Sequence, residues 1–256
     1  MKWFTLVILV FTTASTAIAN RTSEMPINYI QLSQDFLYAA RTGDSVQAYL
    51  DTLASADTKQ LFAQLNTENE KLAFWLNIYN GFTQVLLKNN PEKYKSRGAF
   101  FSDKQIHIAQ HKLSLDLIEH GILRRSKIKW SLGYLNKLFT SRFERGFRVE
   151  KLDSRIHFAL NCGAKSCPPI AFYDPGEIDA QLDLATRAYL AEEAEFDAKA
   201  NIVKLPAIMG WFRGDFGGKK NMLELLRKDD LIPANSTPKI EFKKYDWTLF
   251  LNNYKS

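Results

Sequence analysis

The residues best suited to chemistry lie close together, between Arg155 and Pro169. Cys162 and Cys167 flank a Gly-containing loop, and His157 precedes both. An imidazole beside a thiol lowers the pKa of the thiol, and the resulting thiolate can attack a carbonyl carbon. This pattern predicts a thiol-dependent hydrolase or acyltransferase acting on peptide, amide or ester bonds. In that hypothesis Cys167 is the nucleophile and His157 is the base.

The local structure decides which of these side chains face each other. Residues 155–161 alternate between polar and apolar types, which favours a strand, although so short an apolar run is also compatible with a helix. In a strand, Arg155, His157 and Asn161 share one polar face. If this alternation continues, the side chain of Cys162 points into the protein interior. Cys167 is then the better candidate for the nucleophile.

The two cysteines also support a structural interpretation. Thiols this close in sequence, in a protein that is exported, more often form a disulfide than remain free. A Cys162–Cys167 disulfide would pin the loop, and His157 would then only hydrogen-bond a neighbour. Metal binding is not expected, because the spacing lacks the second ligand pair of a structural zinc site. We expect no cofactor.

Two predicted helices carry further polar residues. Asn77 and Asn80 lie one turn apart on a helix that is apolar on nearly all faces, so these amides must brace a loop or line a pocket. Glu119 lies on a later helix beside His120 and Arg124, which share a face. These three form either a row of exposed charges on the helix surface or part of a site, as an acid or as a group that binds an anion. In the enzyme hypothesis Asn77 or Glu119 orients the imidazole.

These groups are expected to line one cleft, the usual form of a site for a small-molecule or peptide ligand. The residues expected to bind that ligand are Arg155, Asn80, His120, Arg124 and Asn161.

The hydrophobic pattern predicts an α+β fold that is predominantly helical, with a small, mainly antiparallel sheet and a central buried helix. Helices are predicted over residues 27–54 with a break at Gly43-Asp44, from Asp57, over 67–88, over 115–124, from Asp174, over 208–212 and over 221–228. Strands are predicted over residues 105–109, 202–205 and 239–243. The helix over 67–88 starts at a capping box of Thr67 and Glu70. We expect residues 20–256 to form one globular domain.

The N-terminus predicts export. Lys2, an apolar run over residues 3–11 and the small residues Ala17-Ile18-Ala19 match a cleavable signal peptide over residues 1–19. The run is too short to span a bilayer, so we expect a secreted or periplasmic protein with no membrane span. With 24% charged residues and a net charge of +6, the chain shows no basic stripe, and nucleic-acid binding is not expected.

Several segments resemble blocks of the family catalogued as domain of unknown function 547, in the same order. They are Trp75–Asn80, Leu113–Arg124, Arg155–Pro169, Trp211–Phe216 and Tyr245–Trp247. The resemblance spans roughly residues 60–250 and implies a domain of exported bacterial proteins and of plant proteins, with no agreed activity. It also implies motif positions at Asn77, Asn80, Glu119, His120, Arg124, Arg155, His157, Cys162 and Cys167. The family tends to have Gly in the turn where this chain has Gln110-His111.

Two hypotheses therefore remain open from the sequence. The first is a cell-envelope enzyme built around a His/Cys pocket. The second is a non-catalytic envelope module that binds a ligand beside a disulfide-pinned loop.

Overall fold

The computed structural model describes residues 26–255, so the expected signal segment, residues 1–19, lies outside the described residues. The α-helices are α1 (Tyr29–Thr42), α2 (Gln47–Ser55), α3 (Thr58–Gln64), α4 (Glu68–Asn89), α5 (Arg97–Ser102), α6 (Arg142–Phe147), α7 (Ile178–Glu193), α8 (Ala207–Trp211) and α9 (Gly218–Lys228). Between them lie the 3-10 helices η1 (Pro91–Ser96) and η3 (Ser154–Phe158) and the π-helix η2 (Leu117–Leu123).

Two small sheets complete the fold, which confirms the predicted α+β class. Strands β1 (Ile106–Ile108) and β2 (His111–Leu113) form an antiparallel hairpin. Strand β4 (Ile202–Leu205) pairs antiparallel with β3 (Glu195–Asp197) and parallel with β5 (Lys239–Phe242). The β1–β2 turn holds Ala109 and Gln110 at φ 49° and 64°, the left-handed region that favours glycine.

Helix α4 is the predicted central helix. Its capping box is present, with the Thr67 hydroxyl accepting from the Glu70 N–H and the Glu70 carboxylate accepting from the Thr67 N–H. Most of its residues are buried, and Trp75 packs edge-to-face against Phe143 and Phe147 of α6. Helix α1 runs against α4 at Gly81, where an added Cβ would lie 2.5 Å from the Phe36 ring. The sequence therefore puts a small residue where two helices approach closely.

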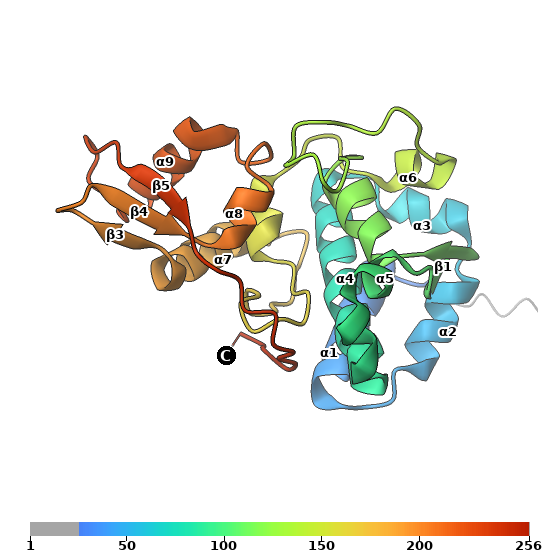
Figure 1. The fold of residues 1–256 in the computed structure, drawn as a ribbon. Coiled ribbons are helices and arrows are strands. Elements are labelled where there is room, and N and C mark those ends of the chain that lie inside the picture. The colour runs from blue at the N-terminus through green and yellow to red at the C-terminus, as the bar shows by residue number, and fades with distance from the viewer. Residues whose placement is uncertain (1–25, 256) are drawn as a thin grey trace, which may run out of the picture.

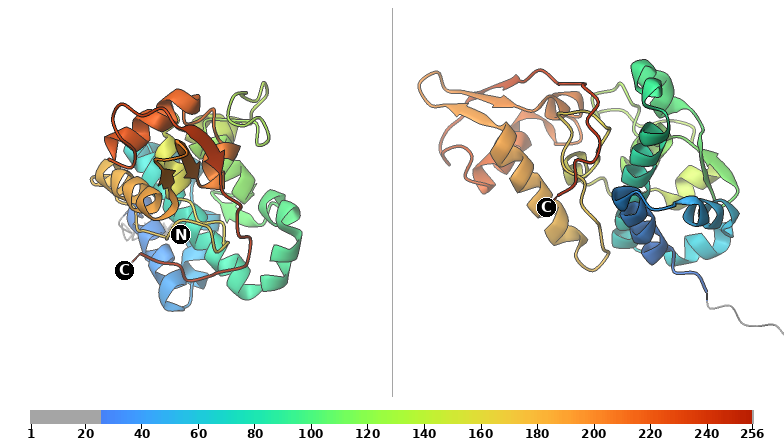
Figure 2. Two further views of the ribbon diagram at one scale, coloured as in Figure 1. Left: turned by 60° about the vertical axis from the view of Figure 1, so that its left-hand side comes forward. Right: turned by 90° about the horizontal axis from the view of Figure 1, so that it is seen from below.

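The buried side chains form two clusters, one in each of two lobes. The larger cluster surrounds α4 and includes helices α1 to α6, while the smaller one lies between the three-stranded sheet and helices α7 to α9. Figure 1 shows the lobes side by side, with α4 and α1 facing α7 and α8. The right view of Figure 2 shows the same separation, with the C-terminal segment passing between the lobes.

The predicted strand over residues 155–161 is wrong. Residues Ser154–Phe158 form the 3-10 helix η3, because the Asp153 carboxylate caps its first turn by accepting from the Arg155 N–H at 2.9 Å. The chain then continues as a loop through the two cysteines. The helix predicted from Asp174 starts later, at Ile178, after a turn in which the Asp174 carboxylate accepts from the Gly176 N–H.

Candidate functional site

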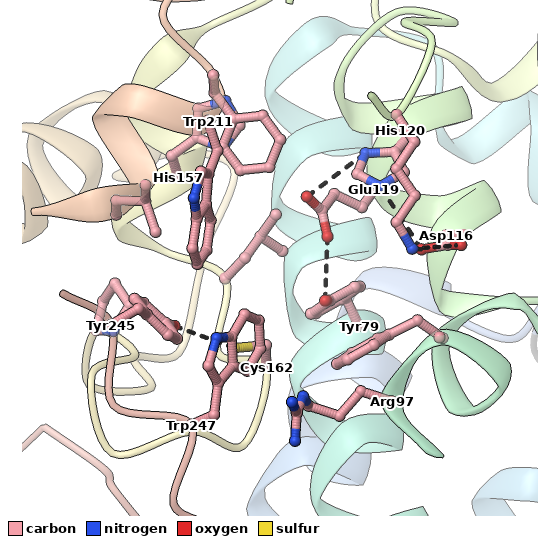
Figure 3. Close-up of a pocket in the computed structure, with 17 residues that line it drawn as sticks. Tyr79, Arg97, Asp116, Glu119, His120, His157, Cys162, Trp211, Tyr245 and Trp247 are labelled. Carbon is pink, nitrogen blue, oxygen red and sulfur yellow. Dashed lines mark hydrogen bonds and ion pairs between the residues drawn. The ribbon is translucent and has the colours of Figure 1, made fainter. Parts of the chain in front are cut away.

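A cavity of about 410 Å³ lies between the two lobes. The larger lobe contributes charged and polar side chains from α4, α5 and η2, and the smaller lobe contributes aromatic side chains from α8 and the C-terminal segment. Figure 3 shows these two walls facing each other, with the cysteine loop between them. A concave site of this size that combines an aromatic wall with a few polar groups is the usual form of a small-ligand pocket.

The acidic groups of the cavity come from η2 and from Asp116, the residue that precedes it. Glu119 accepts a hydrogen bond of 3.1 Å from the Tyr79 hydroxyl, and Asp116 binds the Lys129 ammonium at 2.8 Å. Burial opposes ionisation of Asp116, but hydrogen bonds from His120 and Lys129 outweigh it and hold the pKa of Asp116 below its usual value. Burial raises the pKa of Tyr79 well above its ordinary value, so its phenol stays protonated and donates to Glu119.

The wide turns of η2 set the positions of these acids. The Arg124 N–H donates to the Glu119 carbonyl and the Ser126 N–H to the Gly121 carbonyl, each across five residues at 2.8 Å. π-Helical turns of this kind are rare and are frequently found at functional sites. The predicted helix over 115–124 is therefore present, but it is wound as a π-helix over most of its length.

A buried polar network joins this wall to the smaller lobe. Arg124 donates from Nη1 to His120 Nδ1 at 2.9 Å and from Nε to Asp215 Oδ2 at 2.6 Å. His157 contacts the same Asp215 oxygen through Nε2 at 2.8 Å and stacks on Phe212 with ring centroids 4.1 Å apart. The side chains of Arg124 and Asp215 are 0% exposed. Glu119, His120 and Arg124 therefore do not form a row of exposed charges.

The donors of this network fix the states of both imidazoles. A guanidinium can only donate, so His120 Nδ1 accepts from Arg124 and carries no proton there. Burial lowers the pKa of His157 below its usual value, and the Arg124 charge lowers it further, which outweighs the attraction of Asp215. His157 is therefore neutral and donates its Nε2–H to Asp215. Hydrogen bonds from His157 and Arg124 hold the pKa of Asp215 below its ordinary value, although burial opposes its ionisation.

The lowered pKa of His157 predicts a loss of stability on mild acidification. Above the unfolded-state pKa of about 6.5, the imidazole is neutral in both states, and the folded state keeps its full stability. As the pH falls from there toward the folded-state pKa, only the unfolded chain takes up the proton, so stability declines by up to about 1.4 kcal/mol per pH unit. Urea unfolding at pH 7.5 and 5.5 should show that the free energy of unfolding declines less in His157→Gln than in the wild type. Equal declines would contradict this assignment.

The opposite wall is aromatic. Trp211 stacks on Trp247 at 5.5 Å, and Tyr245 lies within 4.8 Å of both rings, centroid to centroid. The Arg97 guanidinium lies 4.8 Å above the Trp247 ring, at the edge of the cavity nearest α5. Trp211 and Trp247 present flat apolar surface to the cavity, and Arg97 adds a positive charge beside it (Figure 3).

Cys162 and Cys167 form the predicted disulfide. Cys162 lines the cavity, whereas Cys167 is buried, which reverses the orientation predicted from strand parity. The Tyr245 hydroxyl lies 3.2 Å from the Cys162 sulfur and 3.1 Å from the Cys167 sulfur. Burial raises the pKa of Tyr245, so its phenol can donate to either sulfur.

The remaining predicted site residues lie outside the cavity lining. Asn77 and Asn80 brace loops: Asn77 bonds the N–H and carbonyl of Tyr173, and Asn80 bonds the backbone of residues 159 and 161. Asn161 ties together the cysteine loop, bonding the Gly163 N–H and the Pro168 carbonyl. Arg155 faces Asp153, Asp179 and Asp183 at the surface, because η3 is not a strand. The expectation that all these groups share one cleft is therefore wrong.

Several side chains of the site were not predicted from the sequence. They are Asp215, Asp116, Tyr79, Arg97, Lys129, Trp211, Tyr245 and Trp247. All of them except Arg97 and Lys129 fall within the blocks quoted for the family resemblance, but no pattern in the sequence singled them out as site residues. Nothing local shows that residues 211–216 and 245–247 reach His157 or the cysteines. Within residues 26–255, no group of three or more His, Cys, Asp or Glu side chains is arranged to hold a metal ion. No helix in this range is both long and apolar enough to cross a bilayer.

Comparison with known proteins gives one match. A family model described as protein of unknown function, DUF547, matches residues 62–190. That range contains the acidic wall, His157 and both cysteines, but it ends before the aromatic residues of the opposite wall. No curated protein and no solved structure matches the chain.

Proposed function

The chain belongs to the DUF547 family, and from its pocket we propose that it is an exported ligand-binding domain that holds a short peptide or a similar small zwitterion between its lobes. The family description names no activity, so the proposal rests on the geometry of the cavity. Export rests on the signal pattern of residues 1–19.

The observation that carries the proposal is a pair of opposite charges in one cavity that, among the described residues, have no Lys, Arg, Asp or Glu side chain of opposite charge as a partner. Within residues 26–255, no Lys or Arg pairs with Glu119. His120 Nδ1 lies 3.5 Å from the Glu119 carboxylate, but it accepts from Arg124 and so has no proton to donate to it. Arg97 lies over the Tyr94 and Trp247 rings, and no ion pair joins it to a carboxylate in this range. A ligand ammonium would bind Glu119, and a ligand carboxylate would bind Arg97. Apolar side chains of the ligand would pack on Trp211 and Trp247.

Two contacts favour binding over thiol catalysis. The sulfurs of Cys162 and Cys167 are bonded to each other, so neither is available as a nucleophile in this state. His157 directs Nε2 at Asp215, and no hydrogen bond joins its ring to either cysteine within the described residues. The base and the nucleophile of the enzyme hypothesis therefore have other partners here.

Calorimetric titration with the dipeptide leucyl-leucine tests the proposal. We expect the free dipeptide to bind at least about 10-fold more tightly than its N-acetylated or C-amidated form, because each cap removes one charge-assisted hydrogen bond. Equal affinities for the three forms, or binding of none, would contradict the proposal. Mass spectrometry of the recovered peptide should show it intact. Cleavage by the wild type that is lost in Cys167→Ser would establish the thiol hydrolase instead.

A further inference from the structure

The segment between η2 and α6 exposes an unusual amount of apolar surface. Of the thirteen large hydrophobic residues that are exposed within residues 26–255, six lie in this one stretch of ten residues. They are Trp130 (79% exposed), Leu132 (41%), Tyr134 (58%), Leu135 (56%), Leu138 (91%) and Phe139 (91%). We refer to residues 127–140 as the apolar loop. Soluble proteins rarely expose contiguous patches of this kind unless they bind something.

The apolar loop has a defined backbone structure, held by hydrogen bonds. The chain folds back on itself as a short hairpin, with the Ile128 N–H donating to the Leu135 carbonyl and the Lys137 N–H to the Ser126 carbonyl. Its turn is fixed to the smaller lobe, because the Gly214 N–H donates to the Leu132 carbonyl at 2.7 Å. The loop stands out from the body at the top of Figure 1 and at the upper right of the left view of Figure 2. It is a projecting tip, not a groove.

The charge of this region has one sign. No Asp or Glu occurs between Glu119 and Glu144, whereas six Lys and Arg residues do, namely Arg124, Arg125, Lys127, Lys129, Lys137 and Arg142. Within the described residues, Arg125, Lys127 and Arg142 have no carboxylate partner, and the other three pair with Asp215, Asp116 and Glu144. The surface beside the apolar tip is therefore cationic.

We propose that the apolar loop docks the protein on an anionic lipid bilayer. Trp and Tyr side chains favour the membrane–water interface, and the neighbouring cations favour anionic headgroups. A protein partner fits less well, because lysine is depleted at protein interfaces and a projecting tip needs a matching pocket. This docking does not use Glu119 or Arg97, the groups proposed to bind the dipeptide, and it goes beyond the proposed function.

Vesicle co-sedimentation tests this proposal with a chain that starts at Asn20 and so retains every described residue. We expect at least 10-fold stronger binding to vesicles of phosphatidylglycerol and phosphatidylethanolamine than to pure phosphatidylcholine vesicles, with weaker binding at high salt. The double variant Leu138→Ser/Phe139→Ser should lose at least 10-fold in binding. The matched control Leu184→Ser/Phe250→Ser, at sites 47% and 48% exposed, should bind as the wild type does.

The thermal midpoints of both variants check that each is folded, because side chains this exposed contribute little to the core. Equal binding of the wild type to both vesicle types, or equal losses in the two variants, would overturn the proposal. A dimer in light scattering that Leu138→Ser/Phe139→Ser dissociates, without vesicle binding by the wild type, would assign the loop to self-association instead.

Discussion

Replacing Asp215 with alanine is expected to lower the free energy of unfolding by about 3–5 kcal/mol, the range for breaking a buried ion pair. The Asp215 carboxylate receives Arg124 Nε at 2.6 Å and His157 Nε2 at 2.8 Å, and its side chain is 0% exposed. Its removal leaves the Arg124 charge buried without a counterion. The contact also joins the lobes, so we expect its loss to loosen the pocket.

Asp179→Ala is the matched control. Asp179 also binds an arginine, Arg155, at 2.7 Å, but its side chain is 80% exposed. Exposed pairs contribute about 0–1 kcal/mol, so this variant should unfold almost as the wild type does. Urea unfolding of the two variants gives the comparison. Similar, small losses in both would show that the Asp215 pair does not hold the lobes together.

Replacing Asn80 with alanine is the second large expected effect, with a loss of about 2–6 kcal/mol in the free energy of unfolding. The Asn80 amide donates to the Ala159 carbonyl and accepts from the Asn161 N–H, each at 2.9 Å, and it is fully buried. Alanine would strand both backbone groups, and each unsatisfied buried group costs about 1–3 kcal/mol. Since this backbone leads directly into the loop of Cys162, the variant should also weaken dipeptide binding.

Asn69→Ala is the control for replacing an asparagine of α4 that does not brace the cysteine loop. Asn69 lies on the same helix, is exposed, and donates one hydrogen bond to the Pro175 carbonyl. Its replacement should change the unfolding free energy by no more than about 0.5 kcal/mol. A loss below about 1 kcal/mol in Asn80→Ala would mean that the cysteine loop does not depend on this amide.

Local signals in the sequence predicted the elements that position the site. The capping box at Thr67 and Glu70 marked the start of α4, and Gly43 marked the end of α1, where it adopts φ 84°. These predictions hold because a cap or a left-handed residue acts within one helical turn. The alternation over residues 155–161 was misleading, because so short an apolar run is compatible with a strand and with a helix. The Asp153 cap, which starts a helix, decides between them.

The site itself depends on contacts that no local pattern contains. Asp215 lies 91 residues from Arg124 and 58 from His157, so its role emerges only when the segment that follows α8 packs against η3. The aromatic wall likewise brings Trp211 beside Trp247, from a segment that returns between the lobes. The sequence predicted the pairing of the two cysteines because they are close together, but it could not predict which sulfur faces the cavity.

The central claim is that Glu119 binds the ammonium of a small zwitterion, and one calorimetric comparison tests it most directly. Leucyl-leucine and its N-acetylated form are titrated into the wild type, into Glu119→Gln and into Glu92→Gln, whose replaced acid is exposed on η1. We predict that Glu119→Gln binds the free dipeptide at least about 10-fold more weakly and the acetylated form unchanged, while Glu92→Gln matches the wild type for both. If Glu119→Gln lost affinity equally for both ligands, or lost affinity for neither, the claim would be contradicted.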